Sequence, residues 1–119
     1  MRTAGPLLLI LLLPVVAEAA SPGESAFNKC KICHAVTAGA HSAVGPNLHG
    51  LYGRTAGTAP GFAYSPAMKQ SGVVWDDDTL AKFLRDPMGF MPGSRMGFPG
   101  LHDDAELTAL LAYLKEATK

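Results

Sequence analysis

Both cysteines of the chain lie in the stretch Cys30-Lys31-Ile32-Cys33-His34, where residue types and spacing could do unusual chemistry. Two thiols three residues apart lie on one side of a helical turn, and this separation suits thioether bonds to the two vinyl groups of a single haem. The histidine that follows would then lie under the porphyrin as an axial ligand of the iron. The motif therefore predicts one covalently attached haem c, held by Cys30 and Cys33, with His34 on the iron.

Two other chemistries remain open for the cysteine pair. A disulfide between positions three apart closes a very short loop and restrains little of the unfolded chain. A thioredoxin-like redox pair follows a strand, whereas Ser21-Pro22-Gly23-Glu24 is typical of a helix start. We expect the cysteines to fall near the end of that helix. A haem would also complete a core that so short a chain builds with difficulty.

A second ligand is needed on the other face of the iron. The candidates outside the N-terminal segment are Met68, Met88, Met91, Met96, His41, His49 and His102. A thioether favours ferrous iron and raises the reduction potential, which suits an electron carrier. Met96 lies in a loop that Pro92 and Pro99 stiffen and whose glycines would let backbone approach a flat ring. We predict that Met96 is the ligand, with Met91 as the alternative. Otherwise Met88 and Met91 should fill the core, and the histidines should be ordinary loop residues.

The N-terminal segment has the pattern of a secretory signal peptide. Arg2 precedes an apolar run from Pro6 to Ala17, which is shorter than the roughly 20 residues that span a bilayer. Ala17-Glu18-Ala19 supplies a small-x-small cleavage site. We expect residues 1–19 to be a cleaved signal peptide and residues 20–119 to be one domain without stable membrane insertion. Covalent haem attachment takes place after export, so the signal-peptide pattern and the cysteine–histidine motif agree with each other.

Composition excludes several classes of function. The 119 residues leave room for one domain, and 10 basic residues balance 10 acidic ones. A neutral chain has no electrostatic attraction for nucleic acid or acidic lipid, so we expect no nucleic-acid binding. Gly 13 and Pro 9 predict that much of the domain is ordered loop.

Helical signals dominate the remaining chain. Asp103 and Glu106 form a possible capping pair before the leucine stripe Leu107, Leu110, Leu111 and Leu114, and this helix should pack on the N-terminal one. Asp76-Asp77-Asp78 predicts an N-cap and acidic first turn for a helix that ends before Pro87. Ser65-Pro66 to Gly72 predicts a shorter helix. No stretch alternates as a strand should, so we predict an all-α fold.

From Gly23 to Thr118 the chain resembles the class I, mitochondrial-type cytochrome c family, and within it the soluble bacterial members. The resemblance rests on the haem motif and on the runs Gly45 to Arg54, Ala59 to Tyr64, Trp75, Pro92 to Met96, and Ala112 to Lys115. It implies a cytochrome c fold, in which three main helices and one or two short ones wrap around a covalently bound haem c.

The resemblance also implies a set of haem-site residues, which are Cys30, Cys33, His34, Pro46, Arg54, Tyr64, Trp75 and Met96. The two cysteines would carry the thioethers, and His34 and Met96 would be the axial ligands. The carbonyl of Pro46 would accept the second ring N–H of His34 and fix its tautomer. The arginine, tyrosine and tryptophan would surround the buried haem propionates.

Two departures from the mitochondrial pattern concern the surroundings of the methionine and the docking face. Met68 and Phe83 stand where mitochondrial relatives commonly carry Asn and Tyr, so we expect a drier methionine side of the haem and a raised potential. The chain also has few lysines to form a ring around the haem edge. A mixed, near-neutral docking face predicts a weak salt dependence of association.

These features predict a soluble, monomeric electron carrier rather than an enzyme. One electron would pass between donor and acceptor redox proteins through an exposed haem edge, as in a respiratory chain, in the periplasm of a Gram-negative bacterium. The alternatives are a peroxidase-like catalyst or gas-binding sensor with a labile Met96, and a dedicated electron-transfer subunit of one dehydrogenase or oxidase. A catalyst or sensor needs a polar distal pocket, which Met68, Phe83 and Phe98 disfavour.

Overall fold

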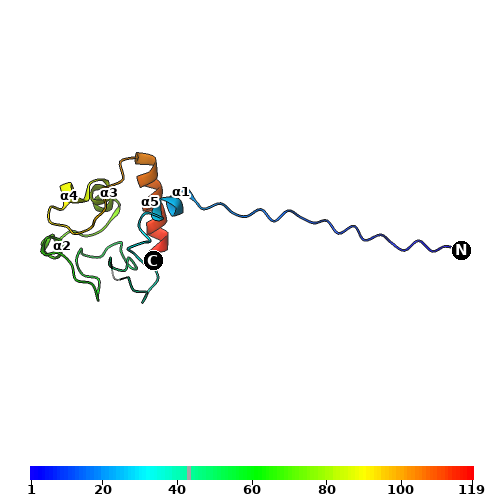
Figure 1. The fold of residues 1–119 in the computed structure, drawn as a ribbon, viewed down its shortest axis with the longest axis horizontal. Helices are drawn as coiled ribbons and strands as arrows, with labels where there is room; N and C mark the ends of the chain where they lie inside the picture. Colours follow the sequence, from blue (N-terminus) through cyan, green and yellow to red (C-terminus); the bar gives the residue numbers. More distant parts are fainter. Residues whose placement is uncertain (43) are drawn as a thin grey trace.

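A computed structural model describes residues 1–42 and 44–119 (Figure 1). The described residues form five helices, which are α1 (Pro22–Phe27), α2 (Pro66–Gln70), α3 (Asp77–Arg85), α4 (Pro87–Phe90) and α5 (Asp104–Ala117). Within these residues the one strand-like feature is an antiparallel bridge between Thr55 and Val74. Long loops connect the helices. Because these residues form helices and only this isolated bridge, the predicted all-α fold is confirmed.

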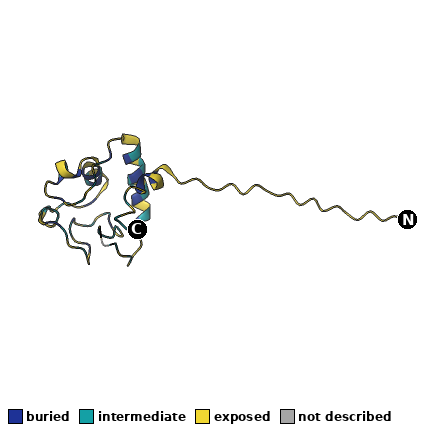
Figure 2. Ribbon diagram, viewed as in Figure 1, coloured by how far each residue is buried: buried dark blue, intermediate teal, exposed yellow. Residues whose placement is uncertain are grey.

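The first twenty residues run away from the helical domain as an extended, exposed segment (Figures 1 and 2). Its apolar side chains from Leu7 to Val16 contact solvent rather than the core. Among the described residues, no helix is both long enough and apolar enough to cross a membrane.

Helices α1 and α5 pack against each other, as the sequence predicts (Figure 1). Gly23 makes this crossing possible, because a Cβ there would collide with the carbonyl oxygen of Ala109 and with the Cβ of Tyr113. The rings of Phe27 and Tyr113 lie 5.3 Å apart between the two helices. The face of α5 toward the core carries Leu107, Leu110 and Leu114, all of them buried.

Helix α1 is shorter than the sequence suggests. The hydroxyl of Ser21 caps its start by accepting a hydrogen bond from the Glu24 amide, at 3.2 Å. The helix ends at Phe27, because the amides of Asn28 and Lys29 donate to carbonyls only three residues back, at 3.2 and 3.3 Å. The prediction that the cysteines fall near the end of a helix is therefore wrong. They lie in the turns that follow α1.

The helix starts predicted from capping residues are confirmed. Asp76 caps α3 in a reciprocal box with Thr79, and Ser65 caps α2. Asp103 caps α5 by accepting from the Glu106 amide at 2.7 Å. The carboxylate of Glu106 does not complete a reciprocal pair, because it bonds to Lys29, 2.6 Å away, and so ties α5 to the segment after α1.

Candidate haem site

The turns after α1 place His34 beside the segment that contains Pro46. The amide of His34 donates to the carbonyl of Cys30 at 2.9 Å, and its ring Nδ1 lies 2.8 Å from the carbonyl oxygen of Pro46. Because a carbonyl only accepts, Nδ1 carries the hydrogen and Nε2 keeps its lone pair. Burial lowers the pKa of His34, and the bond to Pro46 opposes this shift in part. The result is an oriented, neutral imidazole whose Nε2 has no hydrogen-bond partner among the described residues.

Gly45 holds the Pro46 segment tightly against the histidine. A Cβ at Gly45 would lie 2.7 Å from both the carbonyl oxygen of Cys33 and the Cε1 of His34. Glycine is therefore required for steric reasons, and its backbone forms one wall against the imidazole ring. The sequence pattern alone gave no reason to single out Gly45 within its run.

Both cysteines are free and half-buried, and Cys33 directly precedes the histidine. Burial raises the pKa of the Cys30 thiol to about 11, with Lys29 opposing and Cys33 adding to the shift. A thiol with this pKa stays protonated at neutral pH, whereas redox exchange needs the thiolate. Burial therefore disfavours Cys30 as the attacking thiol of a redox pair, and both thiols are free for attachment.

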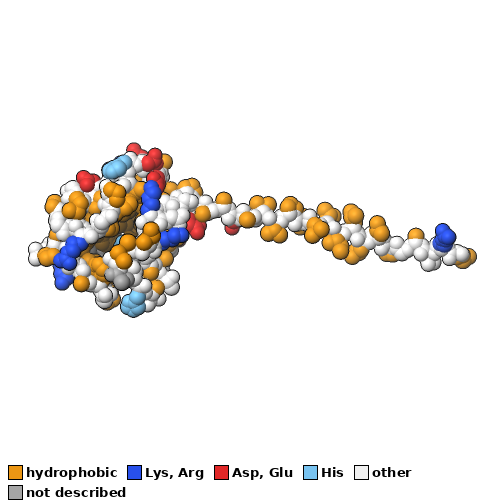
Figure 3. Space-filling model, in the orientation of Figure 1, with side chains coloured by type: hydrophobic (Ala, Val, Ile, Leu, Met, Phe, Trp, Pro, Cys, Tyr) orange, Lys and Arg blue, Asp and Glu red, His pale blue; other side chains and the backbone are white. Residues whose placement is uncertain are grey.

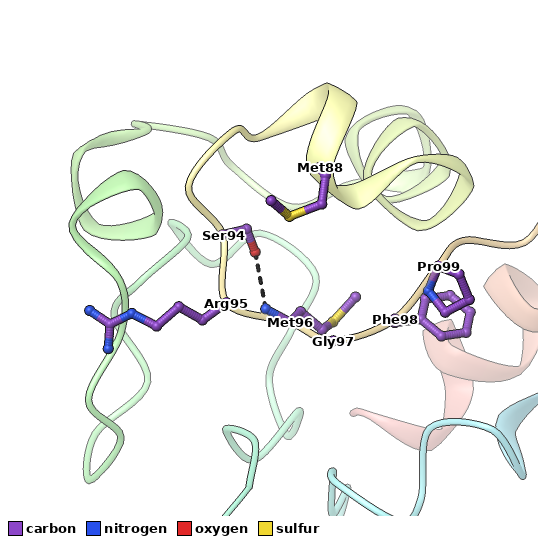
Figure 4. A pocket seen from close by; sticks show the side chains of 7 residues that line it. All are labelled: Met88, Ser94, Arg95, Met96, Gly97, Phe98 and Pro99. Atoms are coloured by element: carbon purple, nitrogen blue, oxygen red, sulfur yellow. Dashed lines mark hydrogen bonds between the residues drawn. The ribbon is translucent and has the colours of Figure 1, made fainter.

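Met96 lines a cavity of about 470 Å³ together with Met88, Ser94, Arg95, Gly97, Phe98 and Pro99 (Figure 4). The Met96 side chain is half-buried, and the Arg95 side chain leaves the loop in the opposite direction from that of Met96. The loop amide at Met96 lies 3.5 Å from the hydroxyl of Ser94, which makes a weak contact. Met96 is thus presented into open space next to the apolar core.

The other candidate ligands are placed differently. Met91 is buried in the core at 5% exposure, as predicted for a filler residue. The same prediction is wrong for Met88, which is 52% exposed, because the short helix α4 turns this side chain out of the core. His41, His49 and His102 are exposed loop residues, as expected. Met68 is half-buried against the core.

The backbone joins Arg54 to Trp75. The Trp75 amide donates to the Arg54 carbonyl at 3.0 Å, beside the bridge between Thr55 and Val74. Two guanidinium nitrogens of Arg54 donate to the carbonyls of His49 and Asn47, at 2.9 and 3.3 Å. These bonds fix the direction of the guanidinium and leave it other N–H donors, since arginine has five.

Tyr64 lies near Arg54, and the hydrogen of its hydroxyl is not used. Its hydroxyl oxygen accepts from the Ala59 amide at 3.2 Å, and among the described residues neither this O–H nor the Trp75 indole N–H finds an acceptor. Burial raises the pKa of Tyr64, while the Ala59 amide and nearby Arg54 oppose the shift. The three side chains therefore offer spare donors of a kind that binds carboxylates.

One face of the domain carries an apolar hollow. In the space-filling view, hydrophobic side chains gather in a hollow of the domain (Figure 3). Half-buried apolar residues border the core, and Cys30, Leu48, Met68, Met96 and Phe98 are among them. Phe83 is buried with its ring 5.1 Å from that of Trp75, so no hydroxyl enters from this position. No cluster of three or more His, Cys, Asp or Glu that could hold a bare metal ion occurs in the part of the chain described.

The residues present therefore fit a haem better than any other group considered. They combine two adjacent thiols, an imidazole with a free Nε2, an accessible thioether, an apolar hollow and spare donors for carboxylates. Arg54, Tyr64 and Trp75, which only the resemblance had linked, lie in one region. Gly45 and the ion pair between Lys29 and Glu106 are the features that sequence reasoning missed.

Comparisons with known proteins agree with this fit. A family model described as Cytochrome c matches residues 20–118. Cytochrome c2 of Blastochloris viridis is 43% identical over 103 residues, covering 87% of this chain and 81% of that protein. Cytochrome c2 iso-2 of Magnetospirillum fulvum is 51% identical over 90 residues, covering 76% and 93%. Among solved structures, cytochrome cH from Methylobacterium extorquens superposes with a TM-score of 0.74 at 43% identity, covering 80% of this chain and 95% of that one.

Proposed function

Because the chain belongs to the cytochrome c family and carries one covalently attached haem c, we propose that Cys30 and Cys33 would hold this haem and that His34 and Met96 would bind its iron. The protein is a one-electron carrier between redox proteins rather than an enzyme. The bound haem supplies an iron that cycles between two oxidation states, and the chain supplies attachment, ligands and surroundings.

The free Nε2 of His34 is the observation that carries the assignment. The bond from Nδ1 to the Pro46 carbonyl, at 2.8 Å, orients the ring and makes the imidazole a better electron donor. Gly45 allows the Pro46 segment to approach the imidazole this closely, since a Cβ at this position would collide with the ring. The protein therefore offers a ligand that needs little rearrangement when the oxidation state of the iron changes.

Met96 would supply the softer of the two ligands of the iron. A thioether stabilises the ferrous state, and the apolar residues on this side add to that preference by excluding polar groups. Met68 and Phe83 bring no hydroxyl or amide side chain to the methionine side. We therefore expect a higher reduction potential than the same ligands would give in a polar pocket.

Arg54, Tyr64 and Trp75 would bind the haem propionates. Carboxylates taken out of water need hydrogen bonds or opposite charge, and these side chains bring both. The two carbonyls that hold Arg54 keep the guanidinium in position before any carboxylate arrives. This part of the site would keep the propionate edge of the haem inside the domain.

A redox titration of the wild-type protein and of Met96→His tests the ligand assignment. We expect a one-electron transition in both, with a lower potential in the variant, because imidazole favours ferric iron more than a thioether does. Met91→Leu is the matched control and should keep the wild-type potential, since Met91 is buried in the core. Equal reduction potentials for wild type and Met96→His would show that Met96 is not a ligand of the iron.

Export to the periplasm of a Gram-negative bacterium is the cellular setting that we propose. It is supported by the signal-like pattern of residues 1–19 and by the bacterial relatives, such as the cytochrome c2 of Blastochloris viridis. The extended segment lies outside the helical domain, so its removal would leave the fold intact. We propose that the processed domain 20–119 acts as a monomer. An intact mass that includes residues 1–19 would contradict the cleavage.

A further inference from the structure

The side chain of Asn47 makes three hydrogen bonds, and the roles assigned above leave it without a task. Its Nδ2 donates to the carbonyls of Thr37 and Ala40, at 2.7 and 2.8 Å. Its Oδ1 accepts from the amide of His49 at 2.8 Å. Because a carbonyl only accepts and an amide N–H only donates, these partners determine which end of the side chain is oxygen and which is nitrogen. Asn47 therefore ties the turn at residues 37–40 to the segment 47–49.

The same segment holds Arg54 through two backbone carbonyls. One guanidinium nitrogen donates to the carbonyl of His49 at 2.9 Å, and another donates to the carbonyl of Asn47 itself at 3.3 Å. Both acceptors thus belong to the residues that the Asn47 side chain joins. The guanidinium makes no further hydrogen bond or ion pair within the described residues, so the directions of these two carbonyls decide where it points.

Each of the two acceptor carbonyls lies in a peptide plane that is anchored at its N–H. The plane after Asn47 is anchored by the Leu48 amide, which donates to the carbonyl of Ala35 at 2.8 Å. The plane two peptides further on is anchored by the Gly50 amide, which donates to the carbonyl of Thr118 at 2.6 Å. Because a peptide unit is planar, an anchored N–H also directs the carbonyl of the same unit.

The peptide plane between these two is held by the Asn47 side chain. Its N–H belongs to His49, and the only partner of this amide among the described residues is Oδ1 of Asn47. Its carbonyl, that of Leu48, accepts from the Leu51 amide at a longer 3.1 Å. The angle between the two carbonyls that hold Arg54 therefore depends on Asn47.

We propose that Asn47 is a positioning residue, whose side chain directs the Arg54 guanidinium toward the haem propionates. This inference rests on the proposed function, in which Arg54 binds the propionates. A fixed cation near the haem favours the ferrous state, because reduction adds a negative charge beside it. A guanidinium that turns toward water loses this effect to screening. Loss of the Asn47 hydrogen bonds should therefore lower the reduction potential.

The test is a redox titration of the holoprotein in wild-type form and in matched variants. Asn47→Ala should have a lower potential than wild type. Asn47→Ser should fall less, because a hydroxyl also accepts from the amide two residues on. Asn28→Ala is the control and should keep the wild-type potential, since it removes the same side chain from an exposed position where it makes no hydrogen bond within the described residues.

A double-variant cycle with Arg54→Gln shows whether the effect passes through the arginine. Arg54→Gln alone should lower the potential, because it removes the cation. In that background Asn47→Ala should cause little further shift, since substitutions that act through one another are not additive. Thermal unfolding of each holoprotein checks that it is folded during the titration, and Asn47→Ser replaces Asn47→Ala in the cycle if the alanine form is not.

The outcomes separate this inference from the assignment of Arg54. If Arg54→Gln lowers the potential and Asn47→Ala does not, the inference is overturned and the assignment stands. If Asn47→Ala shifts the potential equally with and without Arg54, the effect passes through another part of the site, such as the neighbouring Pro46 carbonyl, and the inference is also overturned. An unchanged potential in Arg54→Gln would remove Arg54 from the propionates, and the inference would fail with it.

Discussion

At the scale of single residues, the orientation of His34 depends on its neighbours in space. The histidine follows the cysteines directly, so the sequence motif predicts it as a ligand. Its tautomer depends on the Pro46 carbonyl, twelve positions away, and on the absence of a side chain at Gly45. Local spacing could not reveal that contact. The resemblance supplied Pro46 but gave no reason for Gly45.

Replacing Gly45 by alanine should disturb the histidine. The new Cβ would meet Cys33 and the imidazole at 2.7 Å, and relief requires movement of the ring or of the backbone. We expect a loss of about 1–3 kcal/mol in the free energy of unfolding, together with a changed reduction potential. The control is Gly50→Ala, where φ is +73° and no atom lies within 4 Å. It should cost about 1–2 kcal/mol through backbone strain but leave the potential unchanged. Equal potentials for Gly45→Ala and wild type would contradict the account.

Methionine placement shows a second limit of residue-level reasoning. Composition and loop signals favour Met96, and the structure presents it into the cavity. The sequence also predicts that Met88 is a core residue, whereas its side chain is 52% exposed in the structure. The side on which Met88 emerges depends on how Pro87 and Asp86 start the single turn of α4 after α3 ends. A turn of four residues has no hydrophobic period from which a buried face could be predicted.

At the scale of elements, the crossing of α1 and α5 depends on the close approach at Gly23. Alanine is a better helix former than glycine by about 1 kcal/mol, so Gly23→Ala would stabilise an isolated helix. In the folded protein the Cβ would collide with backbone at Ala109, and backbone cannot move aside as a flexible side chain can. We therefore expect a net loss of about 2–4 kcal/mol, measured by chemical denaturation of the holoprotein.

Ser25→Ala is the control for this substitution, because Ser25 lies on the exposed side of the same helix. Its unfolding free energy should stay within about 0.5 kcal/mol of wild type. A stabilised Gly23→Ala protein would mean that the two helices do not cross as closely as described.

The start of α3 is tied to α5 by a polar network that spans distant parts of the chain. The Tyr52 hydroxyl lies 2.9 Å from the Asp77 carboxylate and 3.1 Å from the Leu111 carbonyl, and Lys115 donates to Asp77 at 2.6 Å. Burial and the Asp77 carboxylate raise the pKa of Tyr52. Sequence patterns predicted both helices from their caps and periods. The network could not be predicted, because its members lie 25 and 38 positions apart.

This network predicts an acid-sensitive contribution to stability. Lys115, followed by Tyr52, lowers the pKa of Asp77 below its ordinary value of 3.8. A carboxyl whose pKa is lowered in the folded state binds protons more weakly there than in the unfolded state. Its contribution is therefore complete well above pH 3.8 and is lost as the pH falls below that value.

Asp77→Asn should accordingly flatten the fall in stability on the acid side, as measured by thermal unfolding of the holoprotein from neutral pH downward. Asp78→Asn removes a charge from the same turn but touches neither Tyr52 nor Lys115, and it breaks only the exposed pair with Lys82. Because exposed pairs contribute little to stability, its acid profile should follow wild type. An Asp77→Asn profile parallel to that of wild type would show that the ion pair does not contribute.

At the scale of the whole molecule, the helices enclose the site without filling it. The described part of the chain has a packed zone between α1, α5 and α3 and a hollow lined by apolar side chains (Figures 2 and 3). The sequence predicted this division, since a chain with so much loop needs a large apolar group at its centre. Five ion pairs among the described residues involve Lys29, Lys82, Arg85, Lys115 and Lys119. This pairing agrees with a near-neutral surface.

We propose that His34 and Met96 both remain on the iron while the protein carries electrons. It is tested most directly by the absorption spectra of the purified, exported protein in the ferric and ferrous states, with and without carbon monoxide. We predict a weak far-red sulfur-to-iron band in the ferric form and no reaction of the ferrous form with carbon monoxide at neutral pH. A missing far-red band together with ready carbon monoxide binding would show an open iron and contradict the account.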